Sequence, residues 1–169
     1  MFGDLERTRV IAYSAAFIGL ITFGSWISIP FVPVPLTLQT LFVLLAGVVM
    51  KRSAVIPVSV YVLLGAIGLP VFHNGITGIG TLLGPTGGYL IGFIFAALAT
   101  GLAYEHASSG IRIIGLAAAT VIIYAFGIGW LMVSSGMGFL PALIAGALPF
   151  LPGDAIKAGA AYLIARQLP

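Results

Sequence analysis

Long apolar segments dominate the chain, and short connections rich in glycine, proline or polar residues separate them. Six such segments can be marked, and they cover residues 10–29, 35–50, 53–69, 86–105, 111–134 and 152–167. A helix that crosses the hydrocarbon core of a bilayer needs about 20 apolar residues, because each residue adds about 1.5 Å. The second segment is short by this measure, and the third and last are near the lower limit. The pattern predicts an all-α membrane protein, a single domain of residues 1–169 built as a six-transmembrane-helix bundle.

Prolines stand at the start of two segments. Pro33 and Pro35 precede the second segment, and Pro149 and Pro152 precede the last. Because proline is well tolerated in the first turn of a helix, we expect helices to begin at these places. The stretch "GFLPALIAGAL" (138–148) is too short to span, so we expect it to lie along one face or to dip into the membrane. An alternative joins residues 139–166 into one long kinked helix.

The composition supports a membrane location. Of the 169 residues, 60% are hydrophobic and only 7% are charged, and the mean hydropathy is +1.20. A soluble domain carries about a quarter charged residues, so this chain has too few to present a polar surface to water. The net charge of +3 comes from scattered basic residues that form no patch, which argues against a nucleic-acid partner.

The basic residues predict the orientation. If the six segments alternate in direction, six of the seven basic residues fall on one side of the membrane, and the seventh is Lys157. The six are Arg7, Arg9, Lys51, Arg52, Arg112 and Arg166. Basic residues are enriched in cytoplasmic loops, so the N and C termini are both expected in the cytoplasm.

Polar and aromatic groups collect at the opposite, outer side. Small-molecule pockets have apolar walls and a few polar groups that converge, so this end is the candidate binding site. Each group also has a purely structural interpretation: packing between helices for Gln39, membrane-interface aromatics for Tyr89 and Trp130, and ordinary loop residues for His73 and Asn74. The candidate substrate-binding residues are Gln39, Asn74, Thr86, Gly87, Gly88, Tyr89, Trp130, Asp154 and Lys157.

Two charged residues interrupt the last apolar segment, "LPFLPGDAIKAGAAYLIA" (148–165). Asp154 and Lys157 are three residues apart and therefore neighbours on a helix surface. Charges that face lipid are costly, so the pair is expected to face protein or a cavity. An ionised Asp only accepts hydrogen bonds and a Lys only donates them, which suits a ligand with N–H groups at one end and a negative group at the other. The alternative is a structural ion pair whose lysine reaches the headgroups.

Enzyme chemistry has no support in the residues. His73 and His106 fall on opposite sides of the membrane in this topology, and no second acidic residue lies near Asp154. There is no cysteine, and no phosphate-binding loop followed by a lysine. We therefore predict that the protein is not an enzyme and holds no metal and no cofactor.

Four blocks of the sequence resemble the BioY family, the substrate-binding membrane subunits of energy-coupling factor biotin transporters. They are "IPFVPVPLTLQTLFVLLAG" (29–47), "GLPVF" (68–72), "GPTGGYLIGF" (84–93) and "LPFLPGDAIKA" (148–158). The likeness runs through nearly the whole chain in the same order and spacing. It implies six helices, cytoplasmic termini and a ligand site near the outer face.

The resemblance also implies roles for single residues. Asp154 would accept hydrogen bonds from the ureido N–H groups of biotin, and Lys157 would meet the valerate carboxylate. Asn74 corresponds to a polar loop residue near the ureido ring. Some family members carry an arginine just before "TGGYL", where this chain reads "GPTGGYL", so Lys157 is the basic partner left for the carboxylate.

The first apolar segment carries a candidate partner face. Ala12 and Ala16 stand one helical turn apart in "AYSAAFIGL" (12–20), and such small residues let helices approach closely in lipid. The structural alternative is that these residues pack inside this bundle. The resemblance implies a docking face for the transmembrane coupling subunit, which two ATPase subunits drive.

The sequence thus predicts a membrane protein that captures biotin from outside and delivers it inward, with ATP hydrolysed by partner subunits. Two alternatives remain: a stand-alone facilitator or secondary carrier, and a structural membrane subunit that has no ligand.

Overall fold

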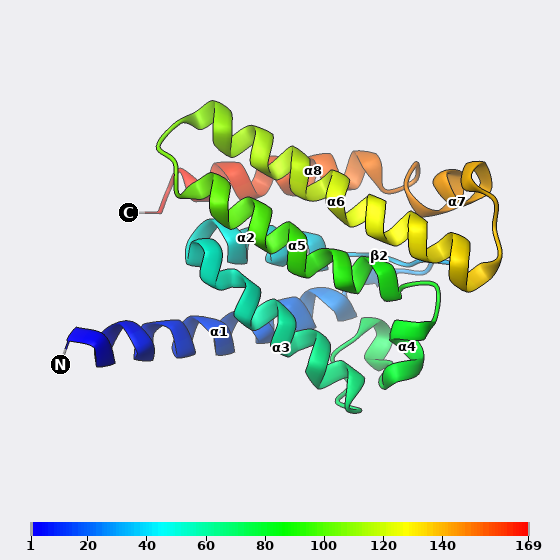
Figure 1. The fold of residues 1–169 in the computed structure, drawn as a ribbon, viewed down its shortest axis with the longest axis horizontal. Coiled ribbons are helices and arrows are strands. Elements are labelled where there is room, and N and C mark those ends of the chain that lie inside the picture. Colours follow the sequence, from blue (N-terminus) through cyan, green and yellow to red (C-terminus); the bar gives the residue numbers. More distant parts are fainter. Residues whose placement is uncertain (1, 169) are drawn as a thin grey trace.

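Helices form nearly all of the protein, as Figure 1 shows. A computed structural model describes residues 2–168. Two short strands, β1 (Ser28–Ile29) and β2 (Leu36–Thr37), pair antiparallel in a hairpin. The helices are α1 (Phe2–Trp26), α2 (Gln39–Met50), α3 (Val55–Ala66), α4 (Ile79–Leu83), α5 (Gly87–Tyr104), α6 (Ser109–Ser135), α7 (Phe139–Gly146) and α8 (Leu151–Ala165), with the 3-10 turns η1 (Lys51–Ala54) and η2 (His73–Gly75). The prediction of an all-α membrane protein is confirmed.

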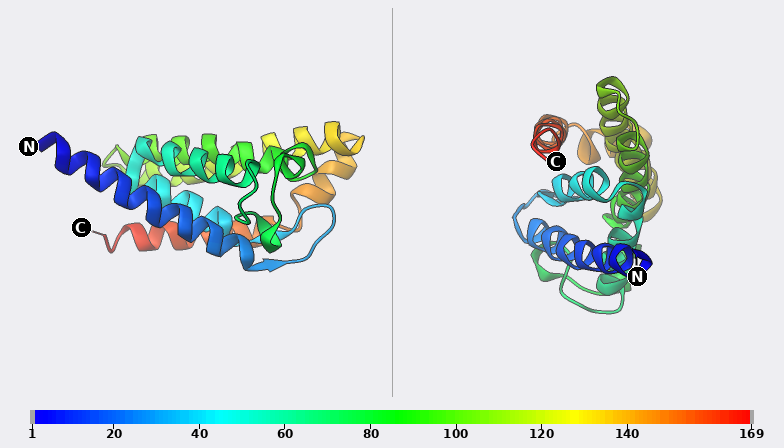
Figure 2. Two further views of the ribbon diagram at one scale, coloured as in Figure 1. Left: turned by 90° about the horizontal axis from the view of Figure 1, so that it is seen from below. Right: turned by 90° about the vertical axis from the view of Figure 1, so that its left-hand side faces the viewer.

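The helices run lengthwise and give the bundle two distinct ends. Both ends of the chain, η1 and the α5–α6 connection lie at one end (Figures 1 and 2). The β1–β2 hairpin, α4 and the α6–α7 connection lie at the other. The predicted cytoplasmic residues Lys51 and Arg52 are in η1, and Arg112 begins α6, so the basic residues gather at the first end. Their orientation in the membrane stays a prediction.

Four helical stretches are long and apolar enough to cross a membrane, namely residues 4–26, 39–66, 87–104 and 109–135. The bent pair α7 and α8 could make a fifth span, with 53° between its two helices. The stretch 39–66 turns back at η1, where Lys51 has a φ of 54°, so that α2 and α3 run in opposite directions (Figure 1). At about 1.5 Å per residue, each of these two helices covers only about 18 Å. The six-span count therefore stays a prediction.

Two expectations about helix starts had different outcomes. A helix start at Pro33 and Pro35 was wrong, because this segment is extended and includes β2, and α2 begins only at Gln39. Pro152 does stand in the first turn of α8. Residues 139–166 do not form one continuous helix, since residues 147–150 separate α7 from α8.

The core of the bundle is α2, which contacts α1, α5 and α8. Val43, Leu44 and Ala46 are almost inaccessible there. Glycine permits the close approach of η1 to α5, because a Cβ at Gly101 would collide with the carbonyl oxygen of Lys51 and the backbone nitrogen of Arg52. Backbone atoms cannot rotate away as a side chain can. The turn between α2 and α3 therefore depends on the missing side chain of Gly101.

We expect Gly101→Ala to destabilise the protein by about 1–3 kcal/mol, the usual cost of inserting a methyl group into a packed interior. Thermal unfolding of the detergent-purified protein measures it. The matched control is Gly129→Ala in α6, where a Cβ would meet no atom within 4 Å. That variant should be neutral or more stable by up to about 1 kcal/mol, because Ala favours helices over Gly. Equal unfolding temperatures for the two variants would contradict the packing argument.

Candidate functional site

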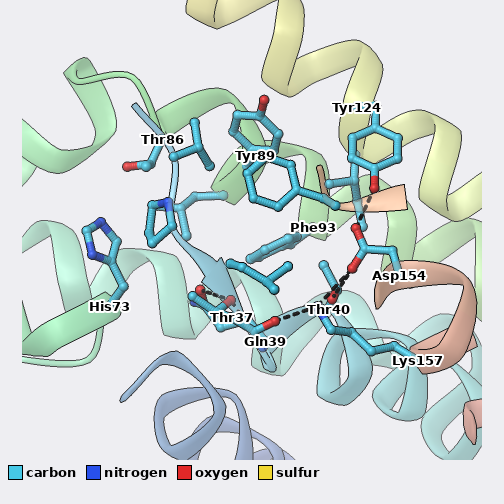
Figure 3. A pocket seen from close by; sticks show the side chains of 16 residues that line it. Thr37, Gln39, Thr40, His73, Thr86, Tyr89, Phe93, Tyr124, Asp154 and Lys157 are labelled. Carbon is cyan, nitrogen blue, oxygen red and sulfur yellow. Dashed lines mark hydrogen bonds and ion pairs between the residues drawn. The ribbon is translucent and has the colours of Figure 1, made fainter. Parts of the chain in front are cut away.

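A pocket lies between α2, α5, α6 and α8, at the end of the bundle that carries the hairpin (Figure 3). Its free volume is about 60 Å³. The hairpin contributes apolar residues to the wall, and Phe31 of the hairpin meets the ring of Phe150 edge-on, with 6.3 Å between centroids. The lining residues are Val34, Pro35, Leu36, Thr37, Gln39, Thr40, His73, Thr86, Tyr89, Leu90, Phe93, Ile123, Tyr124, Phe150, Asp154 and Lys157.

Three donors converge on the carboxylate of Asp154, which is only 6% exposed. Its Oδ1 accepts hydrogen bonds from the hydroxyl of Thr40 at 3.0 Å and from Nζ of Lys157 at 2.9 Å. Its Oδ2 accepts one from the hydroxyl of Tyr124 at 2.6 Å. Asp154 stands in the first turn of α8, where the positive end of the helix dipole favours a negative group. Its own helix α8, through Lys157, and two neighbouring helices, α2 and α6, thus hold this carboxylate in place.

Lys157 lies one turn further along α8 and is 8% exposed. Besides the bond to Asp154, its ammonium group donates to the backbone carbonyl of Thr37 at 2.5 Å. Both charged side chains face the pocket, not the outside of the bundle (Figure 3). The short contact to Asp154 puts the two charges at the same end of the pocket.

Gln39 lines the pocket but is engaged within the protein. Its amide nitrogen donates to the hydroxyl of Tyr61 at 2.5 Å, and Tyr61 donates to the carbonyl of Val71 at 2.9 Å. Its amide oxygen accepts from the hydroxyl of Thr37 at 3.0 Å. This chain of bonds ties β2, α2, α3 and the segment before η2 together, so Gln39 has a structural role even where it borders the pocket.

The other end of the pocket has weaker internal bonding. His73 and Thr86 lie there, on the far side from Asp154 (Figure 3). Nδ1 of His73 is buried and has no hydrogen-bond partner, and burial lowers the pKa of His73 below its ordinary value. Thr86 precedes α5, and its hydroxyl makes one long bond of 3.4 Å, to the carbonyl of Thr81. Tyr89 is fully engaged, since its hydroxyl donates to the carbonyl of Gly146 at 2.8 Å.

Four of the candidate residues from the sequence are not among those that line the pocket. Asn74 is exposed, and its side-chain oxygen accepts a bond of 2.7 Å from the hydroxyl of Ser28. Trp130, Gly87 and Gly88 border a different groove, between α5 and α6. Trp130 donates to the carbonyl of Gly84 at 3.0 Å, and a Cβ at Gly88 would collide with the backbone of Phe126. The glycines therefore serve helix packing.

Sequence reasoning missed Tyr124, which contacts Asp154 directly. Hydropathy treats a tyrosine in the middle of an apolar segment as one more hydrophobic residue. A usable signal was Thr120, because residues four apart share a helix face and the two place polar groups on the same side of α6. His73 has an ordinary loop interpretation in the sequence, yet it borders the pocket.

The face with Ala12 and Ala16 lies away from the pocket, on α1. Both alanines are exposed, and so are Ala15 and Gly19. A Cβ at Gly19 would meet no atom within 4 Å. Packing inside this bundle therefore does not account for these small residues.

The sequence predicts no metal site. Residues 2–168 contain no group of three His, Asp or Glu side chains that could hold an ion.

Comparisons with known proteins agree with one another. A family model described as the BioY family matches residues 3–169. "Biotin transporter BioY" of Thermotoga maritima is 43% identical over 168 residues, covering 95% of each chain. "Probable biotin transporter BioY" of Pyrococcus horikoshii is 39% identical over 163 residues, covering 96% of this chain and 97% of the relative. A crystal structure at 2.1 Å of "the S-component for biotin from an ECF-type ABC transporter" superposes with a TM-score of 0.85 at 31% identity, covering 97% of this chain and 92% of the other.

Proposed function

Because the chain belongs to the BioY family, we propose that it takes up biotin as the substrate-binding subunit of an energy-coupling factor transporter. It is a multi-pass protein of the cell membrane and a transport protein, not an enzyme. The observation that carries the proposal is the buried Asp154–Lys157 pair at one end of an apolar pocket.

The ureido ring of biotin matches the charged end of the pocket. A cyclic urea presents N–H donors beside a carbonyl acceptor, and Asp154 and Lys157 present an acceptor beside a donor, 2.9 Å apart. In this arrangement Asp154 accepts from a ureido N–H and Lys157 donates to the ureido oxygen. The valerate carboxylate is at the far end of a flexible chain, so the short Asp154–Lys157 distance argues against the expectation that Lys157 meets it.

The carboxylate then belongs at the end formed by His73, Thr86 and the start of α5. Nδ1 of His73 is a buried group without a partner and can donate to a carboxylate oxygen. The Thr86 hydroxyl and the N-terminus of an 18-residue helix favour a negative group at the same place. The chain thus has a substitute for the arginine that some relatives carry before "TGGYL".

Biotin needs more room than the pocket provides. Its free volume of about 60 Å³ is well below the roughly 300 Å³ at the lower end of small-molecule pockets. The hairpin 28–37 covers the pocket and has only two short strands of regular structure. We propose that the hairpin moves outward to admit biotin and closes over it afterwards.

The α1 face fits the coupling subunit of such a transporter. Ala12 and Ala16 are exposed small residues near the middle of α1. They permit close contact with a helix of a partner. In this proposal the coupling subunit and its two ATPase subunits supply the energy for release of biotin.

Asp154→Asn tests the ureido end. The new amide nitrogen would face donors, so biotin affinity should fall by about 2–4 kcal/mol, or about 30- to 1000-fold. Isothermal titration of the detergent-purified protein measures it. Because the single variant leaves Lys157 buried without its partner, Asp154→Asn with Lys157→Met serves as a second variant that removes the unpaired charge. Unchanged biotin affinity in both would rule out this end of the site.

Biotin and biotin amide test the carboxylate end. His73→Phe keeps the ring but removes its nitrogens, so it should weaken biotin by about 10- to 100-fold and leave biotin amide nearly unaffected. Lys157→Met should weaken both ligands by similar factors. The reverse pattern, in which Lys157→Met abolishes the preference for the acid and His73→Phe does not, would place the carboxylate at Lys157.

Ala16→Leu tests the partner face. The larger side chain should block close contact with a coupling helix, so that biotin uptake by cells and co-purification of a coupling subunit are lost while biotin affinity is kept. Ala118→Leu changes an exposed alanine on α6 and is the matched control. If Ala16→Leu supports full uptake, the face has another purpose, and if it abolishes biotin binding as well, the face belongs to the bundle.

A further inference from the structure

A polar cleft lies between α5, α6 and α8. The α5–α6 connection beside it is at the end of the bundle where the chain termini are (Figure 1). The last turn of α5, the first turn of α6 and the C-terminal part of α8 surround it, and its volume is about 410 Å³. Its polar lining consists of Tyr104, Ser109, Arg112, Tyr162 and Arg166. No part of the proposed biotin site uses these residues.

Two arginines, Arg112 and Arg166, give the cleft positive charge. Within residues 2–168, neither Arg112 nor Arg166 has a carboxylate within ion-pair distance. Nε of Arg112 donates to the carbonyl of His106 at 2.9 Å, and its guanidinium lies 5.3 Å from the ring centroid of Tyr104. The neighbouring Glu105 is occupied by Arg52 in a two-bond pair.

Two further features of the cleft favour an anion. Tyr104 lines the cleft and is only 6% exposed, and its buried hydroxyl has no hydrogen-bond partner within residues 2–168. The 27-residue helix α6 begins there, and the side chain of Ser108 does not cap it. The first N–H groups of a helix are unsatisfied donors at its positive end. Two guanidinium groups, hydroxyl groups and a helix N-terminus together suit a phosphate.

An apolar groove continues from the cleft between α6 and α8. It has a volume of about 390 Å³, and Tyr162 lines both the groove and the cleft. Its walls are mostly small or aliphatic, with Leu116 and Ala117 on α6 and Ala158 and Gly159 on α8. A phosphate site that opens into an apolar groove matches a phospholipid better than a free phosphate ion, because an acyl chain can occupy the groove.

We propose that this cleft and groove bind one anionic phospholipid, with its phosphate at Arg112 and Arg166 and an acyl chain between α6 and α8. Basic pockets between membrane helices on the cytoplasmic side recognise anionic headgroups in this way. The groove reaches Asp154, which also lines the biotin pocket. The lipid therefore borders the ligand site from the side.

The test is thermal unfolding of the detergent-purified protein with added dioleoylphosphatidylglycerol, dioleoylphosphatidylcholine or inorganic phosphate. Phosphatidylglycerol should stabilise the protein more than phosphatidylcholine, and phosphate alone should have little effect. In the double variant Arg112→Gln/Arg166→Gln, the apparent affinity for phosphatidylglycerol should fall about 30-fold, since each arginine near an anionic lipid is worth about 1 kcal/mol. Biotin affinity without added lipid should be kept, which shows that the variant is folded.

Two control variants test whether the response to phosphatidylglycerol depends on the cleft and on the groove. Arg7→Gln/Arg9→Gln removes the same charge from the same end of the bundle and should keep the response to phosphatidylglycerol. Gly159→Leu fills the groove at a position where a Cβ meets no atom within 4 Å, and it should reduce the stabilisation by phosphatidylglycerol. Equal effects of the two lipids, or a full response in the Arg112/Arg166 double variant, would overturn the proposal. Full stabilisation by inorganic phosphate alone would contradict the binding of a lipid and would indicate a site for free phosphate.

Discussion

The structure depends on one buried ion pair in a protein with very few charges. Removing two charges from water is costly, and their attraction offsets the cost only if further hydrogen bonds satisfy them. Thr40 on α2 and Tyr124 on α6 donate to Asp154, and Lys157 donates to the Thr37 carbonyl on β2. Three separate segments must therefore arrive at the start of α8 together. The pair acts as a constraint on the architecture as well as a candidate binding group.

The two ends of the pocket differ in how completely their polar groups are hydrogen-bonded. Every oxygen of Asp154 already has a donor, and Gln39 is tied to Tyr61 and Thr37. At the opposite end, the buried Nδ1 of His73 has no partner. A ligand gains most from a site where its groups replace missing bonds, since exchanging one satisfied bond for another yields little. If the ligand carboxylate binds at the His73 end, as proposed, its recognition there would add affinity beyond that of the preformed ureido end.

The sequence predicted those parts of the fold that depend on length and hydropathy. The segments expected at 86–105 and 111–134 match α5 and α6 to within two residues. A continuous apolar segment in lipid must satisfy its backbone hydrogen bonds internally, which a helix does. The extended residues around Pro33 and Pro35 were missed, although a residue that precedes proline is biased away from the helical region. The charged residues Asp154 and Lys157 stood out because charge inside an apolar segment is rare. Tyr124 did not stand out, because tertiary packing decides whether a tyrosine in a membrane helix faces lipid or the interior of the bundle.

Asp154 connects the two ends of the protein that the proposals concern. Its carboxylate holds α8 to α6 through Tyr124 and borders both the biotin pocket and the α6–α8 groove. In the proposed binding mode, a ureido N–H would compete with Tyr124 and Thr40 for the lone pairs of this carboxylate, and biotin would then change the forces that hold α8 against its neighbours. A ligand shifts a conformational equilibrium only through contacts that differ between the two states. In that binding mode the bonds of Asp154 would be such contacts, and they would give the occupied pocket a physical route to the packing of α8 and so to the end of the bundle that holds the chain termini.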